Sequence, residues 1–288
     1  MQVEESIKTW GQLSSNESMT RNKIIAVKPL NKAVLGIRAV LLALTVLTVY
    51  ALATLDYRSV DIYTAVADTI SNFKLMFLQP YSHRLSLWEA LYGVVITLGL
   101  AFLTTLFGAV IALFLGLLAA QNLAPKLVTN LIKGFVAFIR AVPTILWVLI
   151  FAVAAGLGSA AAVIGMTFHS ISYLTKAYSE SFEDLDADVI EALKASGANW
   201  WQIVFQAVIP SSVTYLLSWT FLRFEINFAN AVAMGAAAGA AGIGFDLFMA
   251  GEYYFDLREV GLITYLILGF AVCLEMCSTT MKARFQKK

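Results

Sequence analysis

Long apolar stretches alternate with short polar segments along most of this sequence. A helix that crosses the hydrocarbon core of a bilayer needs about 20 predominantly apolar residues. Six stretches reach that length with few or no charges: residues 34–55, 90–125, 127–156, 160–178, 207–232 and 260–281. A helix satisfies its own backbone hydrogen bonds in lipid, so the pattern predicts an all-α, polytopic membrane protein with six transmembrane helices.

The composition points to lipid as the main solvent of this chain. Its mean hydropathy is +0.76, with 59% hydrophobic and 14% charged residues. Soluble domains carry about 25% charged residues, so one water-soluble core of this composition is excluded. The net charge is +1 and no basic stripe occurs outside the termini, so nucleic-acid binding is not predicted.

The placement of lysine and arginine predicts the orientation of the spans, because cytoplasmic loops carry an excess of these residues. The head, the second and fourth loops and the tail fall on one side and hold thirteen of them. The opposite side holds only Arg58, Lys74, Arg84 and Arg258. We therefore expect a multi-pass protein of the cytoplasmic membrane with both termini in the cytoplasm.

The spans divide the chain into an N-terminal head, a first helix, a core of five helices and a tail. The polar head and the lack of a small-residue cleavage pattern argue against a cleaved signal peptide. Cys273 and Cys277 are expected to be ordinary lipid-facing or packing residues, with neither a disulfide nor a metal site. The predicted segments are 1–33 (cytoplasmic), 34–55 (additional helix), 88–281 (core, with a cytoplasmic loop at 180–208) and 282–288 (cytoplasmic tail).

The loop before the fifth span predicts a short, well-delimited helix. Asp188 followed by Glu191 has the spacing of a capping box, and Asp186 with Asp188 places negative charge at the positive end of the helix dipole. Gly197 supplies the left-handed stop expected just past a helix end. Pro210 falls near the entry of the fifth span, where a missing amide donor costs least. A capped surface helix of this kind suits docking into a groove of another protein; a solvated loop with a chance helix is the alternative.

The same loop resembles the EAA motif of ATP-binding-cassette (ABC) importer permeases. The resemblance rests on Glu191-Ala192-Leu193, then Gly197, then Ala207-x-Ile209-Pro210. The resemblance implies a type I importer permease fold, in which this loop is the coupling helix that docks into a cytosolic ATPase. The residues to which it assigns coupling are Glu183, Asp188, Glu191, Ala192, Gly197 and Pro210.

Further along, the chain resembles the phosphonate-type branch of these permeases. The segment 223–227 reads Arg-Phe-Glu-Ile-Asn, and 239–244 reads Gly-Ala-Ala-Gly-Ile-Gly. Phe228 stands near the place of a usual arginine, and Ala241 replaces a glycine. The resemblance implies phosphonate, phosphite or a related oxyanion as the solute. Another solute, such as an amino acid, methionine or a quaternary amine, remains open.

Ionisable and amide residues within spans are candidates for function, because they are costly in lipid. Arg223 and Asn227 share one face of the fifth span with Thr220 and Asn230, whereas Glu225 points elsewhere. This polar stripe predicts either the wall of a water-filled path or a seam between subunits. The alternative for Arg223 is that it satisfies helix-end carbonyls or a carboxylate. The residues hypothesised to line a translocation path are Arg140, Arg223, Glu225 and Asn227.

Three other features of the spans also predict structure. Pro143, beside Arg140, is expected to kink the third span, either as part of a gate or as a static bend. His169 is expected to be a packed, hydrogen-bonded histidine. The small residues of 235–244 allow backbones to approach closely, as in a tight turn on the outer side.

The sequence contains no phosphate-binding GxxxxGK[ST] loop, no nucleophile–base pair and no cluster of metal ligands. We therefore expect a transporter subunit without cofactor, not an enzyme. The family resemblance implies a cytosolic ATPase dimer, an extracytoplasmic solute-binding protein and a homodimer of this chain with the path at its axis, in contact with membrane lipid. A secondary transporter or channel is a rival that would predict internal symmetry, which the sequence lacks.

Overall fold

A computed structural model describes residues 32–55 and 61–286 of the chain, and every regular element in this part is helical. The chain divides into two units, residues 1–62 and 63–288. The regular element of the first unit is α2 (Lys32–Thr54), of which Ala33–Thr54 is long and apolar enough to cross a membrane. The predicted first span at 34–55 therefore coincides with one helix.

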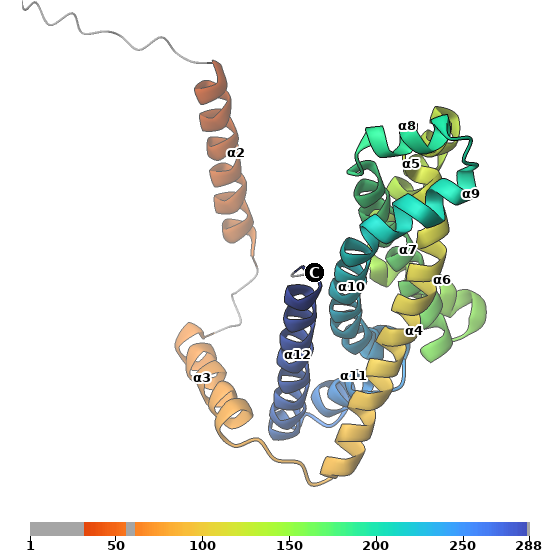
Figure 1. Ribbon diagram of the computed structural model, residues 1–288. Coiled ribbons are helices and arrows are strands. Elements are labelled where there is room, and N and C mark those ends of the chain that lie inside the picture. The colour runs from red at the N-terminus through yellow and green to blue at the C-terminus, as the bar shows by residue number, and fades with distance from the viewer. Residues whose placement is uncertain (1–31, 56–60, 287–288) are drawn as a thin grey trace, which may run out of the picture. The chain divides into compact units, whose positions relative to one another are not determined.

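The second unit is a bundle of long helices with short ones at both ends (Figure 1). Its longest elements are α4 (Leu87–Ala119), α7 (Ser159–Glu183), α10 (Ile209–Ala238) and α12 (Leu257–Gln286). Helices of intermediate length are α3 (Ile62–Leu78), α5 (Lys126–Ala141) and α6 (Thr144–Ala155). Its short elements are α8 (Ala187–Ala195), α9 (Trp200–Ile203), α11 (Ile243–Phe248) and the π-helical turns η1 (Val204–Val208) and η2 (Met249–Tyr253).

Four helices of the described part are long and apolar enough to span a membrane, and a fifth span results if the bent pair of α5 and α6 is counted as one. The four are α2, α4, the continuous helix Trp200–Ala238 and the segment Leu257–Met281 of α12. The remaining predicted span, 160–178, lies in α7, which has the length but is not among the helices that meet the hydropathy criterion.

Helix α7 is more polar than the other spans because protein surrounds it. It packs against α4, α6, α10 and α5, and its buried positions include Thr167, Ser170 and Ser172. Small residues permit this close packing: a Cβ added to Gly108 of α4 would lie 2.7 Å from the Cβ of Ser170. A helix enclosed by other helices does not need an apolar surface, which explains its low hydropathy.

The predicted kink at Pro143 is a complete break. Helix α5 ends at Ala141, α6 begins at Thr144, and the two helices meet at 87°. Proline has no amide hydrogen to donate and its ring clashes with the preceding turn. The indole Nε1 of Trp147 donates to the carbonyl oxygen of Ile139 at 3.0 Å, so a side chain on one arm satisfies a backbone group on the other.

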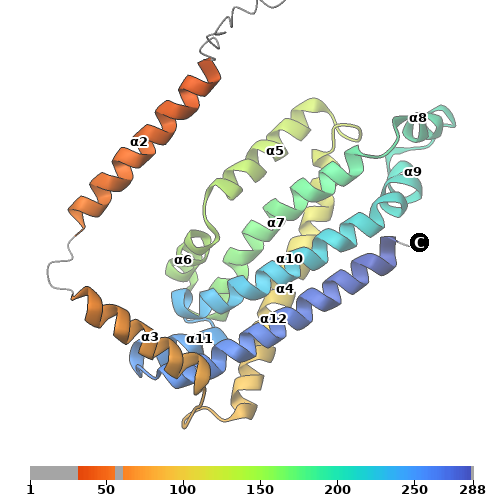
Figure 2. The same ribbon diagram turned by 90° about the vertical axis from the view of Figure 1, so that its left-hand side faces the viewer.

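The short helices occupy opposite ends of the bundle. In both ribbon views α8 and α9 lie at one end, α11 lies at the other, and the C-terminal end of α12 points toward the end that carries α9 (Figure 2). The small residues of 235–244 fold α11 back onto the end of α10, and a Cβ at Gly235 would collide with the backbone of Gly244. The expected close approach in this segment is confirmed.

Alanine in place of Gly244 should destabilise the chain, because its Cβ would collide with the backbone carbonyl of Val232, which cannot move without shifting α10. Overpacking of this kind costs about 1–3 kcal/mol. The same substitution at Gly99, which has open space around it, should be neutral or stabilising. Thermal unfolding of the two variants in detergent measures the difference, and equal melting temperatures would contradict the packing.

Candidate functional site

Helix α8 begins at Asp186, whose carboxylate caps it. The Oδ1 atom of Asp186 accepts a hydrogen bond from the backbone N–H of Asp188 at 3.0 Å. The sequence prediction of a capping box between Asp188 and Glu191 is wrong: Asp188 lies in the first turn and the cap is two residues earlier. The negative charge expected at the start of the helix is nevertheless present.

The helix stops where the sequence predicts. Gly197 follows the end of α8 with φ of +84°, a left-handed conformation that costs a residue with a Cβ about 1–2 kcal/mol. The N–H of Ala198 donates to the carbonyl of Leu193 at 3.0 Å, and that of Gly197 donates to Lys194 at 3.0 Å. These two bonds form a Schellman motif, so the chain reverses sharply after Ser196.

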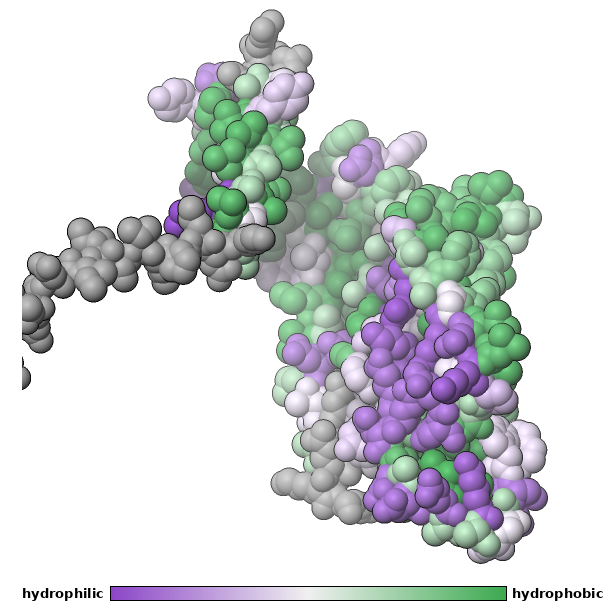
Figure 3. Space-filling model, turned by 90° about the horizontal axis from the view of Figure 1, so that it is seen from above, coloured by the Kyte–Doolittle hydropathy of each residue, from purple (hydrophilic) through white to green (hydrophobic). Residues whose placement is uncertain are grey.

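One side of α8 is anchored and the other is free. Ile190 is 3% exposed and packs in an apolar cluster with residues of α7 and α10, and Leu193 packs against the same cluster. Glu191, Ala192 and Lys194 are exposed. Figure 3, seen from the end that carries α8 in Figure 1, shows hydrophilic side chains gathered over this end and hydrophobic side chains beside them. The helix is therefore anchored along one side and exposed along the other.

Helix α9 continues this surface and is held by a capping box that the sequence prediction missed. Asn199 and Gln202 exchange side-chain to backbone bonds at 2.9 and 2.7 Å; the spacing of an N-cap residue and a glutamine three positions later is the signal. The indole Nε1 of Trp200 donates to the carbonyl of Leu123 at 2.9 Å. This bond ties α9 to the loop between α4 and α5.

Pro210 lies inside a continuous helix. The π-helical turn η1 directly precedes it, and the N–H of Ile209 bonds to the carbonyl of Val204, five residues back. The prediction that Pro210 sits near the entry of the fifth span holds, but the helix already begins at Trp200. We interpret the π turn as the accommodation for the proline ring and its missing donor.

The Glu183 side chain bonds to other segments of this chain. Its Oε1 accepts from the backbone N–H of Gln121 at 2.8 Å and from Nζ of Lys133 at 2.9 Å. It therefore joins the end of α7 to the loop after α4 and to α5. Of the six predicted coupling residues, Asp188, Glu191 and Ala192 lie on α8 and Gly197 ends it, whereas Glu183 and Pro210 lie outside it.

Arg223 is buried at the contact between α10 and α7. It is 2% exposed; its Nε donates to Oγ of Ser170 at 3.1 Å, and its Nη2 lies 3.0 Å from Nδ1 of His169. Its guanidinium also lies over the ring of Tyr173, 5.2 Å from the centroid. No carboxylate of the described residues pairs with it, so neither alternative in the sequence prediction, helix-end carbonyls or a carboxylate, is realised. His169 is hydrogen-bonded, as expected.

Asn227 extends the same network to α4. Its Nδ2 donates to Oγ1 of Thr105 at 2.9 Å, and its amide exchanges bonds with Ser170. Closer to α8, the hydroxyls of Tyr178 and Thr220 lie 2.6 Å apart. Three residues of the predicted polar stripe, Thr220, Arg223 and Asn227, therefore bond to other helices of the same chain. Their placement along a water-filled path or at a seam between subunits stays a prediction. Thr105, Ser170 and Tyr173 were missed, although hydroxyl groups within apolar spans are a usable signal.

The structure does not gather the four predicted path residues into one site. Arg223 and Asn227 belong to the buried network, whereas Arg140 is exposed near the end of α5 and lines a separate pocket. Glu225 is half-buried and has no hydrogen bond or ion pair with any described residue. Its predicted separation from Arg223 is confirmed.

The sequence matches a known protein family. The family described as "Binding-protein-dependent transport system inner membrane component" matches residues 112–288, more than half of the chain. The chain belongs to this family. It is thus a multi-pass component of a cell membrane and a transport subunit, not an enzyme.

Several curated proteins are similar to this chain. The phosphite transport system permease protein PtxC of Stutzerimonas stutzeri is 30% identical over 66% of this chain and 69% of that protein. The phosphate-import permease protein PhnE of Mycolicibacterium smegmatis is 28% identical over 61% of this chain but 33% of that protein. The probable D-methionine transport system permease protein MetI of Pasteurella multocida is 24% identical over 70% of this chain and 98% of that protein.

Solved structures have the same fold. An inward-facing structure of the MetNI methionine ABC transporter aligns with a TM-score of 0.63 at 20% identity, covering 69% of this chain and 97% of that chain. A crystal structure of an amino acid ABC transporter aligns with a TM-score of 0.57 at 16% identity, covering 78% of this chain and 99% of that chain. The predicted fold class, an all-α polytopic permease of the type I importer kind, is confirmed.

Replacing Asp186 with alanine should fray the start of α8, because the first-turn amide then loses its cap. N-cap losses of this kind cost about 1 kcal/mol. Asp186→Asn keeps an accepting oxygen and should restore the helix. Hydrogen exchange of the amides of residues 188–191 provides the measurement. Equal protection in the alanine and asparagine variants would contradict the assignment of the cap.

Proposed function

We propose that this chain is the permease subunit of an ATP-binding-cassette importer and that α8 is its coupling helix, which docks into a cleft of a separate cytosolic ATPase. The observation that carries the proposal is the form of α8. It is capped at Asp186, stopped at Gly197 and anchored through Ile190, and Glu191 and Ala192 remain exposed. Membership of a binding-protein-dependent transport family and the likeness to the motif of residues 191–210 support it.

The proposed orientation places the end with α8 and α9 in the cytoplasm, together with both termini. Lys126 and Lys133 lie on α5, which starts just after the end of α4, and Lys194 lies on α8 itself. At the other end, Arg84 precedes α4 and Arg258 lies in the first turn of α12. This distribution agrees with the preference of lysine and arginine for the cytoplasmic side.

We propose that two copies of this chain pair around a central path, so that two coupling helices engage two ATPase subunits, and that a solute-binding protein delivers the cargo at the opposite end. One chain provides one α8. Closure of the ATPase pair on ATP would displace both coupling helices and favour the outward-open state. The solute shifts that equilibrium only through its different affinity for the two states.

The proposed solute class is a small phosphorus oxyanion such as phosphite, phosphonate or phosphate. The named relatives PtxC and PhnE act on phosphite and phosphate. Arg223 supports the same class, because a buried guanidinium without a carboxylate partner is an uncompensated positive charge whose field extends far in a low-dielectric bundle. Methionine is the second candidate, given the similarity to MetI over most of that protein's length.

At 2% exposure Arg223 cannot touch a solute in this conformation. We propose that it acts through its potential, or through direct contact once α7 and α10 separate during the transport cycle. Until then Ser170 accepts a hydrogen bond from the guanidinium, and Asn227 in turn donates to the same Ser170 hydroxyl. Arg140 and Glu225 remain candidates for the path at other positions.

Ala192→Trp tests the coupling surface. The side chain at 192 is exposed, so the indole should leave the permease folded yet obstruct a close-fitting cleft. We expect co-purification with the ATPase subunit and uptake in proteoliposomes to fall at least about tenfold, the effect of losing roughly 1.4 kcal/mol of docking energy. Ser211→Trp, at an exposed position on α10, is the matched control. Normal uptake and coupled hydrolysis by the Ala192→Trp complex would exclude α8 as the coupling element.

Arg223→Gln tests the solute class. Loss of the buried charge should lower phosphite uptake roughly tenfold or more, as expected when a charge-assisted interaction worth about 1.5–3 kcal/mol is removed. Arg223→Lys, which keeps the charge, should retain part of the activity. Thr220→Val removes a neutral hydrogen bond on the same helix and serves as the control. Unchanged uptake by an assembled Arg223→Gln complex would rule out the electrostatic role.

A further inference from the structure

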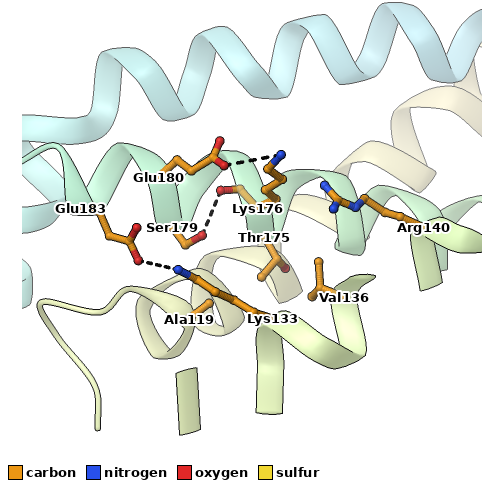
Figure 4. Close-up of a pocket in the computed structure, with 9 residues that line it drawn as sticks. All are labelled: Ala119, Lys133, Val136, Arg140, Thr175, Lys176, Ser179, Glu180 and Glu183. Atoms are coloured by element: carbon orange, nitrogen blue, oxygen red, sulfur yellow. Dashed lines mark hydrogen bonds and ion pairs between the residues drawn. The ribbon is translucent and has the colours of Figure 1, made fainter. Parts of the chain in front are cut away.

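A second polar feature lies nearer to α8 than the Arg223 network. It is a pocket of about 200 Å³ between the last turn of α4, the face of α5 and the C-terminal turns of α7 (Figure 4). The cationic side chains that line it are Lys133, Arg140 and Lys176, and the acidic ones are Glu180 and Glu183. The pocket is therefore polar and net positive.

The positive charges of this pocket are unequally compensated. Lys133 is held by Glu183 at 2.9 Å. Lys176 meets Glu180 at 3.6 Å, a pair one helical turn apart in which both side chains are more than half exposed; such pairs contribute only about 0.3–0.5 kcal/mol. Arg140 has no hydrogen bond or ion pair with any residue that the structure describes. Figure 4 shows the Lys176 ammonium directed toward Glu180 and the Arg140 guanidinium extending into the pocket from α5.

A buried hydroxyl without a partner also lines this pocket. Thr175 is 1% exposed, and its Oγ1 makes no hydrogen bond within the described chain. Its neighbour Ser179 is satisfied by the carbonyl of Lys176 at 2.9 Å. Buried polar atoms are nearly always paired, so the free Thr175 hydroxyl points to a partner that belongs in the pocket. Cationic side chains and a hydroxyl donor that line one pocket are the groups that bind a tetrahedral oxyanion.

We propose that this pocket binds a phosphate-type oxyanion at the coupling-helix end of the bundle, through Arg140, Lys176 and the hydroxyl of Thr175. The anion would compensate the charge of Arg140, compete with Glu180 for Lys176 and accept a hydrogen bond from the Thr175 hydroxyl. It is either a free anion, such as phosphate or phosphite, or the phosphate of a lipid headgroup. The choice of phosphite as a probe rests on the proposed function, but the binding itself requires neither transport nor an ATPase.

Because Glu183 lies just before α8, binding in the pocket would affect the attachment of that helix. Glu183 lines the pocket, bonds to Lys133 and to the loop after α4, and precedes α8 by three residues. An anion that competes for Lys133 would loosen the attachment of α7 to α5 at the base of the coupling helix. Binding of an anion in the pocket would therefore change how firmly α8, the proposed contact with the ATPase, is held.

Titration calorimetry of the full-length chain in an alkyl maltoside, a detergent without phosphate, tests the free-anion form. We expect saturable binding of phosphate or phosphite, one per chain, with sodium chloride at equal ionic strength as the reference. A second arm adds phosphatidylglycerol to the micelles and detects retained lipid by native mass spectrometry. Lipid retention that phosphate displaces identifies the headgroup as the occupant, whereas phosphate binding without lipid retention identifies the free anion.

Thr175→Val is the sharpest variant. It removes a hydroxyl that has no partner among the residues that the structure describes at nearly constant volume, so the empty protein should unfold at the same or a higher temperature. Binding should nevertheless weaken several-fold, and Arg140→Gln should weaken it roughly tenfold. Lys74→Gln, at an exposed position on α3, removes the same charge elsewhere and should leave binding unchanged.

The proposal is overturned if neither anion nor lipid binds above the chloride reference. It is equally overturned if both bind the Thr175→Val and Arg140→Gln variants as tightly as the unaltered chain. Because these measurements use the isolated chain, they stay independent of uptake. If the chain binds phosphate but its complex does not transport phosphite, the proposed solute is wrong and the pocket proposal stands. If the complex transports phosphite but the chain binds no anion or lipid in the pocket, the pocket proposal is wrong and the proposed solute stands.

Discussion

Lipid offers no hydrogen bonds, so a polar group inside this bundle is stabilised only by partners within the protein or in a polar pocket. That constraint decides the position of α7. It carries His169 and Ser170, which hold Arg223, and Tyr178, which meets Thr220 of α10. A helix with these groups cannot face lipid, and α4, α5, α6 and α10 enclose it. The small residues at the α4–α7 contact follow from the same requirement, because short hydrogen bonds between helices need close backbones.

The sequence predicts the fold well where lipid imposes a simple rule and less well where protein replaces lipid. The uncharged stretch 90–125 and the apolar stretch 34–55 both become single helices, because length and hydropathy suffice for a lipid-exposed span. The stretch 127–156 becomes two helices at 87°. Proline predicts a disturbance there, but its angle depends on tertiary contacts such as that of Trp147 with Ile139. Hydropathy alone cannot describe α7, since its environment is other helices.

The candidate sites show a similar division between local and long-range information. Gly197 was predictable because a left-handed stop is a property of a few neighbouring residues. The N-cap was misplaced by two residues because Asp186 and Asp188 have the same chemistry and only the backbone conformation separates them. The partners of Arg223 were out of reach, since Ser170 lies 53 positions away. The polar positions along α10 predict a polar contact, but they do not identify the helix that supplies the partner residues.

Helices α7 and α10 connect the proposed coupling helix α8 to the buried charge of Arg223. Ile190 of α8 packs in one apolar cluster with Leu174 and Tyr178 of α7 and Leu216 of α10. The hydrogen bonds of Arg223 join the same two helices further along. If α8 moves as a rigid element, it therefore bears on both helices that hold the guanidinium. Apolar packing tolerates a small slide, whereas hydrogen bonds of about 3 Å are lost over a fraction of that length. Relative motion of α7 and α10 would thus break these hydrogen bonds first, and this order would release an uncompensated arginine only while the coupling helix is displaced.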